Sequence, residues 1–97
     1  MLILKTLSRN GELHGYEIAN SIQQISGEVL QVEEGSLYPA LQRMLLKGWV
    51  KAEWGATPEN RRARYYRLTP LGRKELELEV SQFERVIEGI LRVLRPA

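Results

Sequence analysis

The segment "EEGSLYPALQRMLLKGWV" spans Glu33 to Val50 and raises a question about how its helix begins. Apolar residues recur at three- and four-residue spacing, which predicts a helix from about Ser36 to Lys47. The residues of this apolar face are Leu37, Leu41, Met44 and Leu45. Gly48 follows, a residue type favoured just beyond a helix end. A plain structural helix could begin without serine, tyrosine and proline so close together.

The first turn of this helix is unusual. Ser36 is a favoured capping residue, and the first four N–H groups of a helix have no internal acceptor, so a proline there loses no hydrogen bond. The residue before a proline disfavours the α region, which makes Tyr38 an alternative start. Pro39, Gln42 and Arg43 point away from the apolar face, and Leu46 also points outward.

Two further helices are predicted before this segment. "LILKTL" (residues 2–7) has apolar residues at helical spacing and is interrupted at Gly11. "GYEIANSIQQIS" (residues 15–26) has an apolar stripe with a period near 3.6, and Gly27 ends it. "EVLQVEEG" is a short connection in which one or two residues of 29–31 are extended.

A β-hairpin is predicted after the third helix. "WVKAEW" (residues 49–54) and "RYYRL" (residues 64–68) each alternate with a period of two. The loop between them, "GATPENRRA", has about nine residues, more than a tight turn needs. Alternation places Tyr65 and Tyr66 on opposite faces, one in the core and one on the surface. Trp49 and Trp54 are better explained as hairpin core than as ligand-stacking residues.

The last helix begins after Thr69, a favoured N-cap, with Pro70 in the first helical position. Its apolar residues are spaced alternately by four and three, which predicts a heptad seam. The seam consists of Leu76, Val80, Phe83, Ile87, Ile90 and Leu94. One copy of the chain has nothing sufficient to cover it, so we expect a homodimer.

The order of elements predicts a winged helix-turn-helix fold, mainly α with a small β-hairpin (α+β). Residues 1–69 would form the DNA-binding domain, and residues 70–97 a long C-terminal dimerisation helix. The third helix would enter the major groove and the hairpin would be the wing. At the tip, Tyr38 could donate to a phosphate and Pro39 could contact a thymine methyl group.

Charge supports this interpretation. The net charge is +2, ten of the fourteen basic residues are arginine, and all twelve acidic residues are glutamate. Four arginines, Arg61, Arg62, Arg64 and Arg67, fall within one short stretch. Arginine suits phosphates and guanine edges because its guanidinium forks onto two acceptors. The alternative for such a cluster is a solvated charged loop.

Other function classes find little support. The chain has no cysteine, no aspartate and one histidine, His14, so we expect no metal site and no cofactor. His14 more readily caps the second helix. Glu33 and Glu34 lack an accompanying base, nucleophile or phosphate loop, so we expect no enzyme. No apolar run approaches the roughly 18 residues of a membrane helix, and no signal peptide is recognisable, so we expect a cytoplasmic protein.

The chain resembles the PadR-type bacterial transcriptional regulators in "HGYEI", "EEGSLYPAL", "GW" (Gly48, Trp49) and "RYYRLTPLG", and in its helical tail. The resemblance implies a homodimer that binds operator DNA and usually represses. It assigns DNA contact to the Ser-Leu-Tyr-Pro helix and the wing, and dimerisation to the last helix. Family members usually carry further helical turns before "LILKTL", so the first helix looks shortened here.

The candidate DNA-binding residues are Ser36, Tyr38, Pro39, Gln42, Arg43, Lys47, Arg61, Arg62 and Arg64. For Tyr38 the alternative is an aromatic packed on the neighbouring helix, and for Arg64 a cross-strand pair at the strand end. Two modes of regulation remain open: a small hydrophobic or aromatic effector between the subunits, or no ligand at all. The rival function is a winged-helix protein-interaction module that does not bind DNA.

Overall fold

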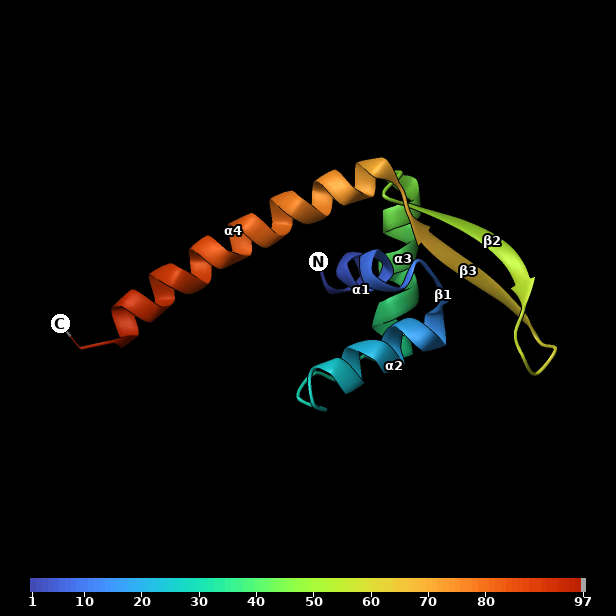
Figure 1. Cartoon of the computed structure of the whole chain (residues 1–97), viewed down its shortest axis with the longest axis horizontal. Coiled ribbons are helices and arrows are strands. Elements are labelled where there is room, and N and C mark those ends of the chain that lie inside the picture. The colour runs from blue at the N-terminus through green and yellow to red at the C-terminus, as the bar shows by residue number, and fades with distance from the viewer. Residues whose placement is uncertain (97) are drawn as a thin grey trace.

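The computed structural model describes residues 1–96 and contains four helices and three strands in that range. Helices α1–α3 and the sheet form the body of the molecule, and α4 extends away from it (Figure 1). The elements are α1 (Leu2–Asn10), β1 (Glu12–His14), α2 (Gly15–Ile25), α3 (Glu34–Leu46), β2 (Val50–Ala56), β3 (Arg62–Leu68) and α4 (Pro70–Leu94).

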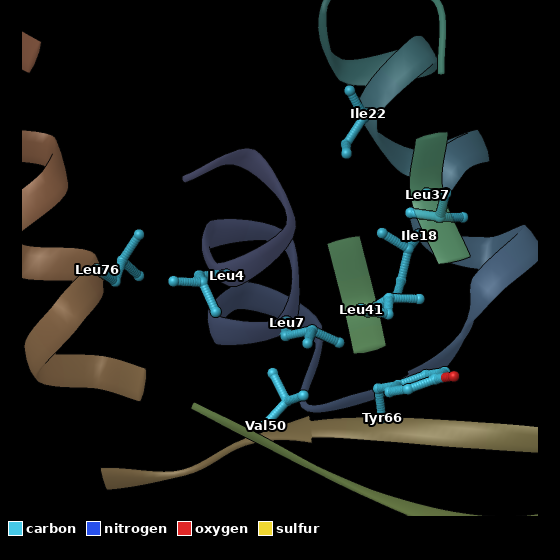
Figure 2. Close-up of a cluster of buried hydrophobic side chains, with 9 residues drawn as sticks. All are labelled: Leu4, Leu7, Ile18, Ile22, Leu37, Leu41, Val50, Tyr66 and Leu76. Atoms are coloured by element: carbon cyan, nitrogen blue, oxygen red, sulfur yellow. The ribbon is translucent and has the colours of Figure 1, made fainter. Parts of the chain in front are cut away.

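A single hydrophobic core joins α1 to every other part of the body. Figure 2 shows Leu4 facing Leu76 of α4 on one side, while Leu7 lies toward the sheet. Burial of these side chains away from water is the main force that holds the three helices against the sheet. The buried apolar residues are Leu4, Leu7, Ile18, Ile22, Leu37, Leu41, Val50, Tyr66 and Leu76.

The sheet confirms the α+β class but has one strand more than the predicted hairpin. Its order is β1-β3-β2, and both pairings are antiparallel. Strand β1 has three residues, and Leu13 pairs with Tyr66 of β3. So short a strand shows no periodicity of its own, because its pairing with a distant segment defines it.

The hairpin strands are longer than predicted, and the prediction of a nine-residue loop was wrong. Pairing continues outward until Ala56 meets Arg62, so that only residues 57–61 form the turn. The N–H of Thr57 donates to the carbonyl of Arg61 at 2.8 Å. Asn60 has φ 62°, a left-handed conformation that asparagine tolerates. Gly55 therefore lies within a strand and does not mark the start of the loop.

The first three helices end just before the glycines that the sequence analysis identified. Gly11, Gly27 and Gly48 have φ of 81°, 64° and 75°, and each follows the last residue or the C-cap of a helix. At the start of α2, His14 is the N-cap, and its N–H donates to Oε1 of Glu17 at 3.1 Å. Residues 26–33 connect α2 to α3, and none of them pairs as a strand.

Thr69 joins three elements at the base of the wing. Its hydroxyl donates to the carbonyl oxygen of Gly48 at 2.6 Å and accepts the N–H of Gly72 at 3.0 Å. Its own N–H donates to the carbonyl of Trp49 at 3.1 Å. A Cβ at Gly72 would overlap that Trp49 carbonyl, so the first turn of α4 lies directly on the chain that leaves α3.

Helix α4 has an inner and an outer part. Near its start, Leu76 is buried and Val80 is partly buried against the core. Every described residue from Ser81 onward is exposed. None of the helices in residues 1–96 has the length and hydropathy needed to cross a membrane.

Thr69→Val is expected to lower the free energy of unfolding by about 1–3 kcal/mol. The substitution removes the donor to Gly48 and the acceptor for Gly72 while it keeps the size of the side chain. Urea denaturation measures the effect. Thr69→Ser retains the hydroxyl and should cost about 1 kcal/mol or less, the loss of one methyl group. Equal costs for the two variants would show that the hydroxyl is not what stabilises the joint.

Candidate nucleic-acid interface

Helix α3 begins two residues earlier than predicted. Glu33 is the N-cap and Glu34 the first helical residue, so Ser36 lies within the first turn and does not cap it. Tyr38 is helical and is not a boundary. Pro39 is the sixth residue of the helix, beyond the four positions that lack an acceptor, so the prediction that it loses no hydrogen bond was wrong. It leaves the carbonyl of Gly35 without its usual intrahelical donor, and Gly35 is exposed to water.

The two faces of α3 are divided as predicted. Leu37 and Leu41 are buried, and Met44 and Leu45 pack against the core. Every DNA-binding candidate on this helix is exposed, and these residues are Ser36, Tyr38, Pro39, Gln42, Arg43 and Lys47. Leu46 is also exposed, at 78%, and it continues the line of Tyr38 and Gln42 at four-residue spacing. The outward leucine noted in the sequence is therefore part of the candidate surface.

Tyr38 packs on α2 and also remains accessible. A Cβ built on Gly15 would come within 2.8 Å of both the Tyr38 ring and its hydroxyl, so the phenol lies against the α2 backbone. The side chain is still 46% exposed. The two interpretations of Tyr38 are thus compatible, because α2 fixes the ring while the rest of it faces solvent.

The inner face of the wing runs from the core toward the turn. Successive cross-strand pairs place Val50 with Leu68, Ala52 with Tyr66 and Trp54 with Arg64. Tyr66 is buried, whereas Tyr65 on the opposite face is only half-buried, which confirms the predicted division. Trp49 packs against the core as expected, but Trp54 is 60% exposed, so its assignment to the core was wrong. Trp54 lies too far along the wing for the helices to cover it.

The arginines of the wing occupy different positions. Arg61 is in the turn, and Arg62 is the first residue of β3 and not part of the tip. Arg64 is partly buried, and its guanidinium carbon lies 5.9 Å from the centre of the Tyr66 ring. Lys47 lies at the far end of α3, with its ammonium 5.2 Å from the centre of the Trp49 ring.

The wing and the N-terminal part of α3 border one hollow of about 380 Å³. Its lining contains two arginines and no carboxylate. Tyr16 also lines it and is 67% exposed, although the sequence pattern placed it in the apolar stripe of the second helix. The lining residues are His14, Gly15, Tyr16, Tyr38, Trp54, Arg62, Ala63, Arg64 and Tyr66.

Negative charge is present nearby, at the start of α3. Glu33 and Glu34 are exposed, and Glu34 in the first turn favours the positive end of the helix dipole. The same carboxylates would repel a phosphate backbone. The exposed cationic side chains among the candidates are Arg43, Lys47, Arg61 and Arg62.

Within residues 1–96, no group of three or more histidine, cysteine or acidic side chains is placed to hold a metal ion.

Residues 3–78 match the sequence pattern of the transcriptional regulator PadR-like family. The chain belongs to this family. PadR-like proteins are transcriptional regulators and not enzymes.

Solved structures of transcriptional regulators share the fold. A transcriptional regulator from Clostridium thermocellum is 30% identical and superimposes with a TM-score of 0.86, covering 97% of this chain and 90% of its own. A PadR family regulator from Clostridium difficile is 28% identical with a TM-score of 0.80, covering 97% and 95%. Bacillus subtilis PadR in complex with operator DNA is 26% identical with a TM-score of 0.71, covering 81% of this chain and 44% of its own.

Gly15→Ala is expected to lower the free energy of unfolding by about 1 kcal/mol or less, because the new methyl group displaces the end of the Tyr38 ring, which is half exposed and can move toward solvent. In a Tyr38→Ala background, which opens this space, the same substitution should cost much less. Urea denaturation of the four proteins measures the coupling between the two positions.

Gly35→Ala is the matched control, because Gly35 is also helical and a Cβ there meets nothing within 4 Å. It should be neutral or stabilising by up to about 1 kcal/mol. A cost for Gly15→Ala that is the same with and without the Tyr38 ring would contradict the packing argument.

Proposed function

We propose that this PadR-like chain is a homodimeric, sequence-specific DNA-binding regulator that represses transcription by occupying an inverted-repeat operator. The observation that carries the proposal is the exposed polar stripe of α3 beside a wing whose inner face bears Arg62 and Arg64, neither of which has an ion pair among residues 1–96. The complex of Bacillus subtilis PadR with operator DNA supports the same use of this fold. The domain division at residues 69 and 70 belongs to this proposal.

On the recognition helix, we assign two roles. Gln42 and Arg43 read base edges in the major groove, because an amide matches adenine and a guanidinium matches guanine. Ser36 and Tyr38 donate to phosphates, and these contacts fix the position of the helix without reading sequence. Pro39 supplies an apolar contact for a thymine methyl group.

The wing and the end of α3 supply the remaining phosphate contacts. Arg61 reaches outward from the turn, while Arg62 and Arg64 face the hollow. Lys47 is a distal phosphate contact, because it lies a full helix length away from Ser36. Such contacts release counterions from DNA and make binding strongly dependent on salt.

The second copy is proposed to bind along α4. Leu76 already packs in the core of its own chain, so the seam available to a partner begins at Val80. The seam residues beyond it are between 38% and 72% exposed, and they are Phe83, Ile87, Ile90 and Leu94. A contiguous apolar stripe of this kind typically marks a surface that another protein covers.

Regulation is proposed to act through the same helix. Because Thr69 joins α4 to the end of α3 and the base of the wing, a change in the angle of α4 changes the spacing of the two recognition helices. A small hydrophobic or aromatic effector between the subunits would produce such a change. Without an effector, the concentration of the protein itself or a partner sets the occupancy of the operator.

The rival function, a protein-interaction module that does not bind DNA, requires a different surface. A surface that binds only protein gives no reason for Arg62 and Arg64 to face the hollow without carboxylate partners. A gel shift against the DNA upstream of the protein's own gene, titrated with salt, distinguishes the two functions. Absence of a salt-dependent shift would favour the rival.

Phe83→Glu is expected to convert the dimer into monomers and abolish tight operator binding, because it buries a charge in the seam. Sedimentation equilibrium at low micromolar concentration measures the change. Leu78→Glu is the matched control: Leu78 is similarly exposed, at 54% against 48% for Phe83, but it lies on the opposite side of α4 from the seam. It should remain dimeric. A wild-type protein that stays monomeric under these conditions would contradict the proposal.

DNA affinity is expected to fall roughly a thousandfold between about 50 and 200 mM salt, for around six phosphate contacts per dimer. Arg61→Gln together with Arg62→Gln should flatten this slope, measured by fluorescence anisotropy. Arg92→Gln is the control, since Arg92 is exposed on α4 and pairs with Glu88 at 2.8 Å. An unchanged slope in the double variant would mean that the wing does not contact DNA.

A further inference from the structure

Trp54 is a large exposed aromatic residue that the fold does not need. It is absent from the core cluster, and 60% of its surface is accessible. Its strand position needs no tryptophan for pairing, because β2 and β3 pair through their backbones. Tryptophan is highly buried on average, so an exposed one raises the question of what its ring contacts.

The side chain of Arg62 lies over the ring of Trp54. The guanidinium carbon of Arg62 lies 4.6 Å from the centre of the Trp54 ring. In the sheet, Trp54 pairs with Arg64, whereas Arg62 is paired one step nearer the turn, with Ala56. Arg62 therefore leans back from the tip toward the helices. A guanidinium over an indole is attracted by the negative face of the ring.

A second pair repeats the arrangement one step further in. Arg64 lies over the ring of Tyr66, with its guanidinium carbon 5.9 Å from the ring centre. Tyr66 is buried in the core, so its position is fixed by the fold. Both guanidiniums border the hollow that Tyr38 of the recognition helix also lines. Trp54 places a second aromatic ring further along the wing, beyond the residues that pack in the core.

Both arginines are available to an anion. Among residues 1–96, neither Arg62 nor Arg64 has a carboxylate within salt-bridge distance. On the opposite face of the wing, Arg67 does have such a partner, with Nη2 4.0 Å from Oε1 of Glu53. On the inner face of the wing, aromatic rings thus contact the arginine side chains. On the opposite face, a carboxylate contacts Arg67.

We propose that Trp54 is a positioning residue that holds the guanidinium of Arg62 in the hollow, so that Arg62 and Arg64 together close on one phosphate of the DNA backbone. The inference rests on the proposed DNA-binding function and assigns a role to a residue that does not itself need to touch DNA. Holding a long side chain in its bound position reduces the entropy lost on binding.

A double-mutant cycle tests the inference on the intact chain. Trp54→Leu removes the π face and retains apolar bulk and all charges, Arg62→Gln removes the cation, and the double variant combines them. Affinity for a mixed-sequence DNA duplex of about 30 base pairs, long enough for both half-sites, is measured by fluorescence anisotropy at low salt. Thermal melting and sedimentation establish that each variant stays folded and retains the oligomeric state of the wild type.

Trp54→Leu should weaken binding roughly five- to thirtyfold for a dimer that uses both wings. In the Arg62→Gln background it should change affinity less than about twofold, because the group it positions is gone. Trp54→Phe keeps an aromatic face and should bind more tightly than Trp54→Leu. These three results are expected together.

An equal loss from Trp54→Leu with and without Arg62 would overturn the inference and leave the proposed function intact, since Trp54 would then act by its own contact. Wild-type affinity in Trp54→Leu would also overturn it. Absence of any salt-dependent DNA binding by the wild type would instead overturn the proposed function, and the inference with it.

Discussion

The hydroxyl of Thr69 is the point on which the arrangement of the molecule depends. It donates to the carbonyl of Gly48 and accepts the N–H of Gly72, so one side chain links the end of α3, the base of the wing and the start of α4. Thr69 and Gly72 are buried, and a buried hydrogen-bonding group left without its partner costs more than an exposed one. Gly72 is required at the same place because a larger residue would overlap the Trp49 carbonyl. Helices α3 and α4 therefore cannot change their relative angle freely.

The sequence predicted those parts of the fold that arise from local patterns. The apolar spacing of α3, its end at Gly48 and the Thr69-Pro70 start of α4 all depend on residues that are neighbours in the chain, and all were confirmed. Strand β1 was missed because it exists only through pairing with β3. The start of α3 was placed too late because Ser36 is a favoured cap, whereas the chain becomes helical from Glu34.

The candidate interface shows the same limit. Exposure of Gln42 and Arg43 followed from helical periodicity, which is a local property. The packing of Tyr38 on Gly15 and the position of Arg62 over Trp54 did not, because each joins segments that are distant in the sequence. Trp54 shows the difference most clearly. Alternation correctly put it on the inner face of the wing, but only the three-dimensional fold shows that the core ends before that face does.

Aromatic rings on the wing can restrict the motion of arginine side chains that have no carboxylate partner. A guanidinium must remain free of carboxylates if it is to bind a phosphate, yet a free arginine side chain is flexible and loses entropy when it binds. A ring beneath the guanidinium limits this motion without neutralising the charge. Core packing can fix the ring only near the base of the wing, as at Tyr66, and further out the ring must stand exposed, as at Trp54. The exposed indole is thus the consequence of placing a positioned cation beyond the edge of the core.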